Sequence, residues 1–214
     1  MILYHFTTSP FSRRVRLALA LKELKVELRD ARDDALHAAD VARLSPLRTV
    51  PVLVDGQRVI PDSNAICQYL DRKVPAPPLW AAGLAGAEGF ELAALADGAI
   101  NILSDLGMRY APLHGDAHFP EVRAALVGRV QRALDRLAER VTKNGPQSGP
   151  LCGEAWSAAD IALYTAVAWL EGLPQRAATF APARAVVDLG WRLPPELSAW
   201  ADQHRQRPDV LALG

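Results

Sequence analysis

The spacing of hydrophobic residues changes along this chain, and the change predicts two structural regions. Between residues 2 and 73, short apolar runs alternate with stretches in which apolar residues recur every three or four positions. The short runs predict strands at 2–6, 26–29, 51–55 and 58–60. The other stretches predict helices at 9–23, 33–44 and 64–73. The predicted order is β-α-β-α-β-β-α, with a parallel first pair and a final antiparallel hairpin closed near Asp55-Gly56.

A proline-rich segment ends this first region. Val74-Pro75-Ala76-Pro77-Pro78-Leu79 can continue neither a helix nor a sheet, because proline lacks an amide proton and fixes its own backbone. After it, the strong patterns are helical, at 88–110, 120–141, 157–170 and 194–206, with Pro208 expected to stop the last helix. Residues 171–192 give an ambiguous pattern, read as one short helix and loops. We predict an α/β domain at 1–74, a linker at 75–84 and an all-α domain at 85–214.

Composition and charge exclude several classes of protein. Half of the 214 residues are hydrophobic, which favours a packed core over disorder, and the formal net charge of zero argues against nucleic-acid and anionic-membrane partners. The sequence lacks an apolar run near the roughly 20 residues of a membrane span. The start of the chain resembles a strand rather than a signal peptide. We therefore expect a cytoplasmic protein with Cys67 and Cys152 reduced.

One helix start carries a strong local signal. Ser157 can accept from the amide of Asp160, and the Asp160 carboxylate can reach back to the amide of Ser157. Trp156 and Ile161 flank this capping box as a hydrophobic staple would. The pattern predicts a folding signal without a chemical role.

Ser9-Pro10-Phe11-Ser12 lies between the first predicted strand and the first predicted helix. Free amides and the dipole at a helix start favour anions, and a hydroxyl there can donate to a bound thiolate. Ser9 is the first candidate, because the proline after it favours an extended backbone. Thr8 and Ser12 are rival donors, and Ser9 can equally serve as a plain helix cap.

Two further segments have a use in binding a peptide-like anion. If the Val50-Pro51 bond is cis, the Val50 backbone groups face a ligand, although only about 5% of such bonds are cis and an edge-strand proline is the simpler interpretation. Asp62 can hold an ammonium and Ser63 a carboxylate, or the pair can act as another helix cap. These segments and Ser9 are all predicted at strand carboxyl ends or adjoining helix starts, where open α/β sheets bind ligands.

Together these motifs resemble the cytosolic glutathione S-transferases. The matching residues are Ser9-Pro10-Phe11 with Arg14-Val15-Arg16-Leu17, Ser45-Pro46, Val50-Pro51-Val52-Leu53, Asp62-Ser63, Ile66, Tyr69-Leu70, Leu151-Cys152-Gly153, Ser157-Ala158-Ala159-Asp160 and Arg207-Pro208. The resemblance implies a thioredoxin-like N-terminal domain, an all-helical C-terminal domain and a homodimer. It also implies glutathione as co-substrate, without a metal.

The resemblance also implies roles for single residues. Ser9 matches the serine that activates the thiol in serine-type members. Pro51 would be cis, and Val50 would pair with the cysteinyl backbone of glutathione. Asp62 and Ser63 would bind the γ-glutamyl end, and Thr49 occupies a position that often contacts the glycyl end.

Two departures from the family pattern matter. Asp62 stands where the family often has Glu or Gln, so its reach toward an ammonium is shorter. Position 9 is serine and has no cysteine nearby, which argues against thiol–disulfide exchange.

The second substrate is expected against the helical domain. The residues proposed for that pocket, with a solvated or dimer-facing stripe as the alternative, are Phe11, Asn101, Ser104, Asp105 and Met108. Arg13 and Arg109 are candidate anion contacts, with surface exposure as the default. The five tryptophans are expected in the core or an interface: Trp80, Trp156, Trp169, Trp191 and Trp200. His114 and His118 without a third ligand match no zinc pattern.

The function expected from the sequence is transfer of the glutathione thiolate to a small hydrophobic electrophile. A glutathione-dependent isomerase or dehalogenase begins with the same thiolate and stays open. A non-catalytic protein that keeps the fold for binding is the alternative from another class.

Overall fold

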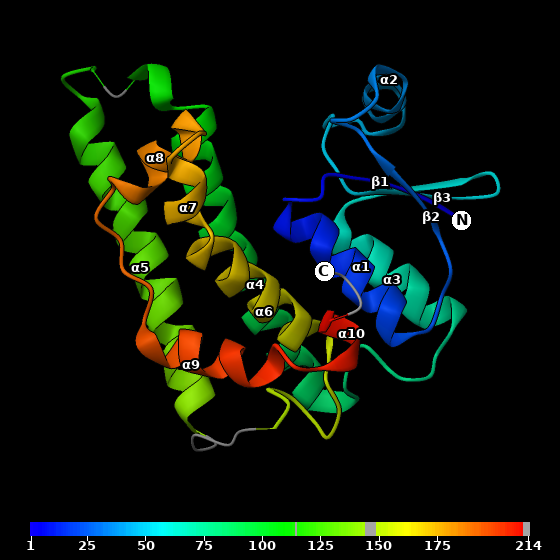
Figure 1. The fold of residues 1–214 in the computed structure, drawn as a ribbon. Helices are drawn as coiled ribbons and strands as arrows, with labels where there is room; N and C mark the ends of the chain where they lie inside the picture. Colours follow the sequence, from blue (N-terminus) through cyan, green and yellow to red (C-terminus); the bar gives the residue numbers. More distant parts are fainter. Residues whose placement is uncertain (114, 144–148, 212–214) are drawn as a thin grey trace.

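The structure is a computed structural model that describes residues 1–113, 115–143 and 149–211. A small sheet with three helices forms the N-terminal part, and a larger all-helical part follows it (Figure 1). The elements of the N-terminal part are β1 (Ile2–His5), α1 (Pro10–Leu21), β2 (Glu27–Asp30), α2 (Ala35–Leu44), β3 (Val52–Asp55), β4 (Arg58–Pro61) and α3 (Ser63–Lys73). This is the predicted β-α-β-α-β-β-α order.

The sheet has the strand order β2-β1-β3-β4. β1 and β2 are parallel and β3–β4 is an antiparallel hairpin, as the sequence predicted. β1 and β3 also pair, in the antiparallel direction, which the sequence did not indicate. Because side chains alternate across a strand, neighbouring residues cover opposite faces. Leu3 and Leu53 pack in the main core with α1 and α3, whereas Tyr4 and Val52 pack in a second cluster with Val41 of α2.

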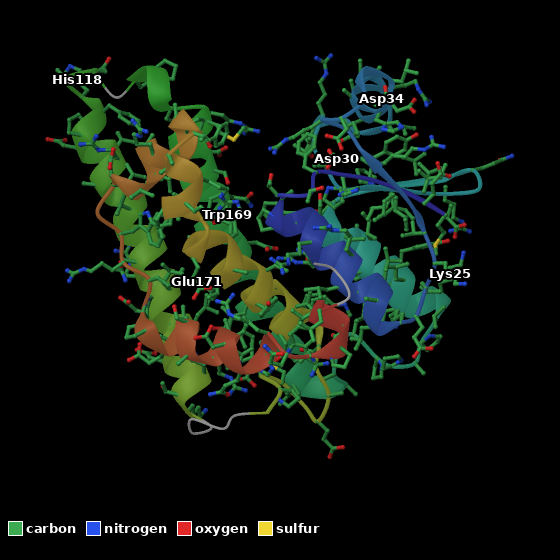
Figure 2. All side chains as sticks on the ribbon, in the orientation of Figure 1. Lys25, Asp30, Asp34, His118, Trp169 and Glu171 are labelled. Carbon is green, nitrogen blue, oxygen red and sulfur yellow. The ribbon has the colours of Figure 1, made fainter. Side chains whose placement is uncertain are left out.

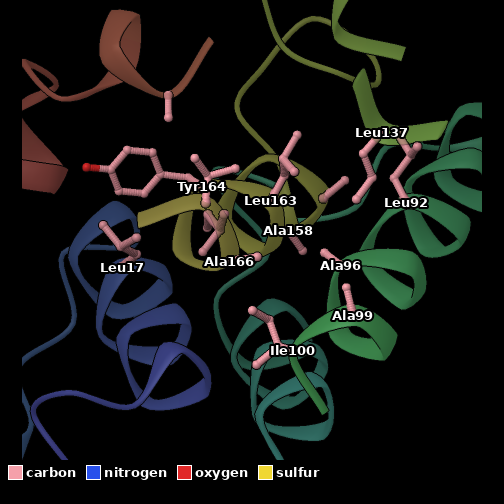
Figure 3. Packing of buried hydrophobic residues seen from close by; sticks show 14 of the residues in the cluster. Leu17, Leu92, Ala96, Ala99, Ile100, Leu137, Ala158, Leu163, Tyr164 and Ala166 are labelled. Atoms are coloured by element: carbon pink, nitrogen blue, oxygen red, sulfur yellow. The ribbon is translucent and has the colours of Figure 1, made fainter. Parts of the chain in front are cut away.

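The C-terminal part contains helices of very different lengths. They are α4 (Gly83–Met108), the 3₁₀ helix η1 (Ala111–Leu113), α5 (Phe119–Lys143), α6 (Ala158–Glu171), α7 (Leu173–Ala177), α8 (Ala181–Val187), α9 (Pro195–His204) and α10 (Pro208–Leu211). α6 is almost entirely buried between α1 on one side and α4 on the other (Figure 3). It therefore joins the two parts of the molecule through one core.

Three expectations about the helices need correction. α4 begins at Gly83 rather than Glu88, and residues 171–192 hold two short helices instead of one. Pro208 begins α10, because proline is well tolerated in the first turn of a helix. Glycine's low helix propensity obscured the start of α4. Gly86 is required there, since a β-carbon would overlap the carbonyl oxygen of Ala81.

A buried lysine fastens the linker to the first domain. Lys22, at the end of α1, is only 5% exposed. Its Nζ donates to Asp71 Oδ1 at 2.9 Å, to the Pro77 carbonyl at 2.8 Å and to the Val74 carbonyl. The ammonium group thus bridges α1, α3 and the proline-rich segment.

We expect Lys22→Met to lower the free energy of unfolding by about 2 kcal/mol, because the acceptors of a buried charged donor lose their partner. Urea denaturation measures this loss. Protease cleavage within 74–79 should also become faster. Lys25→Met is the matched control, because Lys25 is exposed and points away from the core (Figure 2). Equal stability of the two variants would contradict the role of Lys22.

Candidate functional site

The strand register brings the three candidate segments to one edge of the sheet. Tyr4 near the end of β1 lies opposite Val52 at the start of β3, which lies opposite Pro61 at the end of β4. The Ser9 segment follows β1, Val50-Pro51 precedes β3, and Asp62-Ser63 follows β4. All three segments therefore lie at the same edge of the sheet. One expectation is corrected: Val50-Pro51 precedes the amino end of β3, and the antiparallel direction of β3 brings it to this edge.

Ser9 has the extended backbone that Pro10 favours, with φ −76° and ψ 126°. Its Oγ accepts from the Ser12 amide at 3.2 Å, so it caps α1. A hydroxyl that accepts a hydrogen bond keeps its own proton for another acceptor. Capping and thiolate binding are thus compatible roles for the half-buried Ser9.

The two rival hydroxyls lie in different surroundings. Ser12 is fully buried, and its Oγ accepts from the Phe6 amide at 3.4 Å. Thr8 is exposed, and its Oγ1 accepts from Arg32 Nη1 at 2.7 Å. Thr8 and Ser9 therefore lie at the surface, whereas Ser12, like Ser63, is buried and would need a local shift to contact a ligand.

The Val50-Pro51 peptide bond is cis, as the family resemblance implied. Val50 is half-buried, and Thr49 before it is exposed. The Thr49 amide donates to Ser45 Oγ at 3.2 Å, which orients the segment from the buried side.

Asp62 caps α3 with one oxygen of its carboxylate. Its Oδ1 accepts from the Asn64 amide at 2.9 Å and the Ala65 amide at 3.0 Å. Within the described residues Oδ2 has no hydrogen-bond donor, and the side chain is exposed, so this oxygen can receive an ammonium. The backbone of Asp62 has φ +79°, a conformation uncommon outside glycine that gathers at ligand sites.

A buried network of charged side chains forms hydrogen bonds with Ser63 and its neighbour Asn64. Arg14 of α1 donates to Ser63 Oγ at 3.3 Å and Asn64 Oδ1 at 2.8 Å, and it forms a bidentate ion pair with Asp97 of α4. Asn64 also donates to Asp97 at 2.9 Å. Burial alone would lower the pKa of Arg14, but the Asp97 carboxylate raises it above its usual value. Sequence reasoning missed Asp97 and Asn64, which lie far from Arg14 along the chain.

A small pocket of about 110 Å³ adjoins Ser9 on the side of the helical domain. Figure 2 places Trp169 on the side of α6 that faces the β1–α1 segment. The pocket is lined by Thr7, Thr8, Ser9, Pro10, Arg13, Thr165, Ala168, Trp169 and Arg176. Arg13, a candidate anion contact from the sequence, therefore lines the pocket. From the sequence, Trp169 is expected only in the core or an interface, and Arg176 is not singled out. Hydrophobic periodicity cannot identify either residue as part of a pocket.

The residues proposed for the second substrate do not line this pocket. Asn101 and Met108 are exposed, and Asp105 forms an ion pair with Arg109 at 3.3 Å on the surface of α4. Phe11 packs partly against the main core. Their role, with that of Ser104, stays a prediction.

Neither cysteine has the character of a nucleophile. Cys67 and Cys152 are free and buried. Burial raises the pKa of Cys67 to about 12, far from a thiolate at neutral pH. Among the described residues no group of three or more His, Cys, Asp or Glu could hold a metal ion, and no helix has the length and apolar character to cross a bilayer. His114 lies outside the described residues.

The sheet, its cis-proline edge and the all-helical second part define a thioredoxin-like domain joined to a helical domain. Residues 3–78 match the model of the glutathione S-transferase N-terminal domain, and residues 120–203 match that of the C-terminal domain. The chain belongs to the glutathione S-transferase family.

Individual relatives agree with this assignment. Glutathione S-transferase Z1 of Arabidopsis thaliana is 46% identical over 80 residues, 36% of each chain. A probable maleylacetoacetate isomerase of Vibrio cholerae is 37% identical over 110 residues, 50% of this chain and 49% of the relative. These matches span about a third to a half of the relatives' length. A glutathione S-transferase of Methylobacterium radiotolerans, solved with glutathione sulfonate, is 25% identical with a TM-score of 0.74, covering 99% of this chain and 92% of the other.

Proposed function

We propose that this chain is a glutathione transferase that holds glutathione as a thiolate beside Ser9 and presents it to an electrophile in the adjoining pocket. The observation that carries the proposal is the meeting of Ser9, cis Val50-Pro51 and Asp62-Ser63 at one sheet edge. The γ-glutamyl ammonium would bind Asp62 and its carboxylate Ser63, with Val50 pairing to the cysteinyl backbone and Thr49 near the glycyl end. The relative solved with glutathione sulfonate supports this ligand.

Thiolate stabilisation and proximity would supply the catalysis. Ser9 donates its hydroxyl proton to the sulfur, and the first turn of α1 adds a favourable dipole. A thiol with a reference pKa of about 8.5 is then ionised to a larger extent at neutral pH. The sulfur attacks the electrophile without a covalent enzyme intermediate. The chain would act in the cytoplasm. It would form a homodimer, and light scattering after size-exclusion chromatography tests this oligomeric state.

Ser9→Ala tests the assignment of the thiol activator. The pKa of bound glutathione should rise by about one unit, and kcat/KM should fall about tenfold at neutral pH, because one charge-assisted hydrogen bond is lost. Ultraviolet titration of the bound thiolate measures the pKa. Thr8→Ala is the matched control, since Thr8 presents another exposed hydroxyl that lines the same pocket. An unchanged titration in Ser9→Ala, with a shifted one in Thr8→Ala, would move the role to Thr8.

A glutathione-dependent isomerase is the second candidate. A probable maleylacetoacetate isomerase of Vibrio cholerae matches half of this chain, and such a reaction also begins with thiolate attack. Turnover of a cis-unsaturated diketo acid without net loss of glutathione would favour it. Absence of glutathione binding in calorimetry would instead favour the non-catalytic alternative.

A further inference from the structure

Arginines gather around the pocket beside Ser9. Arg13 of α1 and Arg176 of α7 line it. Arg16 and Arg32 stand next to its wall, where Arg16 donates to the Thr7 carbonyl at 3.0 Å and Arg32 to Thr8 Oγ1 at 2.7 Å. The chain as a whole has no net charge, so this cluster is a local feature.

None of these four guanidinium groups has a carboxylate within ion-pair distance in the part of the chain that the structure describes. Eight of the other sixteen arginines form ion pairs: Arg14, Arg29, Arg43, Arg109, Arg136, Arg140, Arg205 and Arg207. Asp30 is the acidic group that acts on Arg16, but its oxygens accept from Thr7 and from the Arg32 amide. The positive charges at the pocket are therefore left without a fixed counter-ion.

The cluster is partly desolvated and repels itself. Arg16 and Arg176 are half-buried, and their Nε atoms are buried without a hydrogen-bond partner among the described residues. Burial, and then the charge of Arg32, lower the pKa of Arg176; burial and the charge of Arg13 lower that of Arg16. An anion placed among these groups would relieve the repulsion and satisfy free donors.

Arg176 is held in position for such a contact. It donates to the Trp169 carbonyl, and its Cζ lies 5.1 Å from the centroid of the Trp169 ring. Arg13 of α1 also lines the pocket, with its Cζ 5.7 Å from the Tyr164 ring. The pocket next to the proposed sulfur position is therefore lined by one arginine from each domain.

We infer that the second substrate is a small electrophile bearing a carboxylate, which binds between Arg13 and Arg176. This inference rests on the proposed function and replaces the expected small hydrophobic electrophile. The volume of about 110 Å³ is below the roughly 300–1,000 Å³ of pockets for drug-sized ligands, which fits a compact anionic group. The carboxylates of glutathione are assigned elsewhere, to Ser63 and to the segment at Thr49.

Two glutathione conjugates of nearly equal shape test this directly. S-(carboxymethyl)glutathione carries a carboxylate on the sulfur substituent, and S-(carbamoylmethyl)glutathione carries a neutral amide there. We expect calorimetry on the wild-type chain to give about tenfold tighter binding of the acid, because a hydrogen bond to a charged group is stronger. The comparison needs no variant and no turnover.

Variants that remove one positive charge identify the residues responsible for tighter binding of the acid. Arg176→Gln and Arg13→Gln should each reduce the acid-to-amide ratio of affinities to within about threefold. Arg176→Lys should retain most of the ratio, because the charge remains. Arg184→Gln is the matched control, since Arg184 also donates to a backbone carbonyl, that of Ala177, but does not line the pocket. Its ratio should equal that of the wild type.

The outcomes separate the inference from the proposed function. If glutathione and both conjugates fail to bind, the proposed function fails. If glutathione binds but the acid and the amide bind equally well, the carboxylate inference is wrong while the proposed function stands. If Arg176→Gln weakens glutathione itself and leaves the acid-to-amide ratio unchanged, the arginines serve glutathione and the inference is overturned.

Discussion

Asp160→Ala is expected to lower the free energy of unfolding by about 3–5 kcal/mol, one of the two largest effects that the structure predicts. Asp160 is completely buried at the start of α6. Its carboxylate accepts from the Ser157 amide at 2.8 Å, the Ser157 hydroxyl at 2.6 Å and the Leu151 amide at 2.7 Å. Alanine leaves these buried donors without an acceptor, and each carries a desolvation cost.

The position of α6 increases the consequence. This helix lies between α1 and α4, so its first turn anchors the core that both domains share (Figure 3). Thermal unfolding should show a decrease in the melting temperature of about 10 °C for a chain of this size. Ser157→Ala should cost about 1 kcal/mol, since it removes one partner only. Asp135→Ala is the surface control, because Asp135 is exposed on α5. An Asp160→Ala melting temperature equal to that of the control would contradict the anchoring role.

This capping box shows what local sequence signals can establish. Ser157 and Asp160 lie three residues apart, so their reciprocal bonds depend on helix geometry alone, and the prediction is confirmed. The β-α-β-α-β-β-α order is confirmed for the same reason, because strand and helix periods are local properties. The cis form of Pro51 came only through the family resemblance, since a single X-Pro step favours trans.

Contacts between distant segments could not be predicted in this way. Arg176 lies in a stretch with no clear period and meets the Ser9 pocket only because α6 packs across α1. Four of the five expected second-substrate residues lie on α4, whereas the pocket beside Ser9 is lined by the β1–α1 segment, α1, α6 and α7. Their role stays a prediction. Asp97 was missed because nothing along α4 indicates that Arg14 pairs with it.

The Arg14–Asp97 pair gives the second large expected effect. The side chain of Arg14 is 3% exposed and that of Asp97 15%, and the pair joins α1 to α4 across the domain boundary. Removing one partner leaves a buried charge uncompensated. Arg14→Met and Asp97→Leu should therefore each lower the free energy of unfolding by about 3–5 kcal/mol. Urea denaturation measures both.

The double variant distinguishes an ion pair from two independent packing contacts. If the charges compensate each other, Arg14→Met/Asp97→Leu should cost less than the sum of the single variants by about 1–3 kcal/mol. The exposed Arg109–Asp105 pair on α4 is the matched control, and its removal should stay within about 0.5 kcal/mol of the wild type. Additive costs at Arg14 and Asp97 would contradict the coupling.

The same variants connect the network to the candidate site. Arg14 donates to Ser63 Oγ and Asn64 Oδ1 at the start of α3, so Arg14→Met frees the Ser63 side chain to reorient, while Asn64 keeps its bond to Asp97. Glutathione affinity should then fall about tenfold, because a γ-glutamyl carboxylate would meet a hydroxyl that is no longer fixed. The affinity is measured by calorimetry at a temperature where the variant is folded. An unchanged affinity in a folded Arg14→Met chain would separate the network from ligand binding and leave it a structural link between α1, α3 and α4.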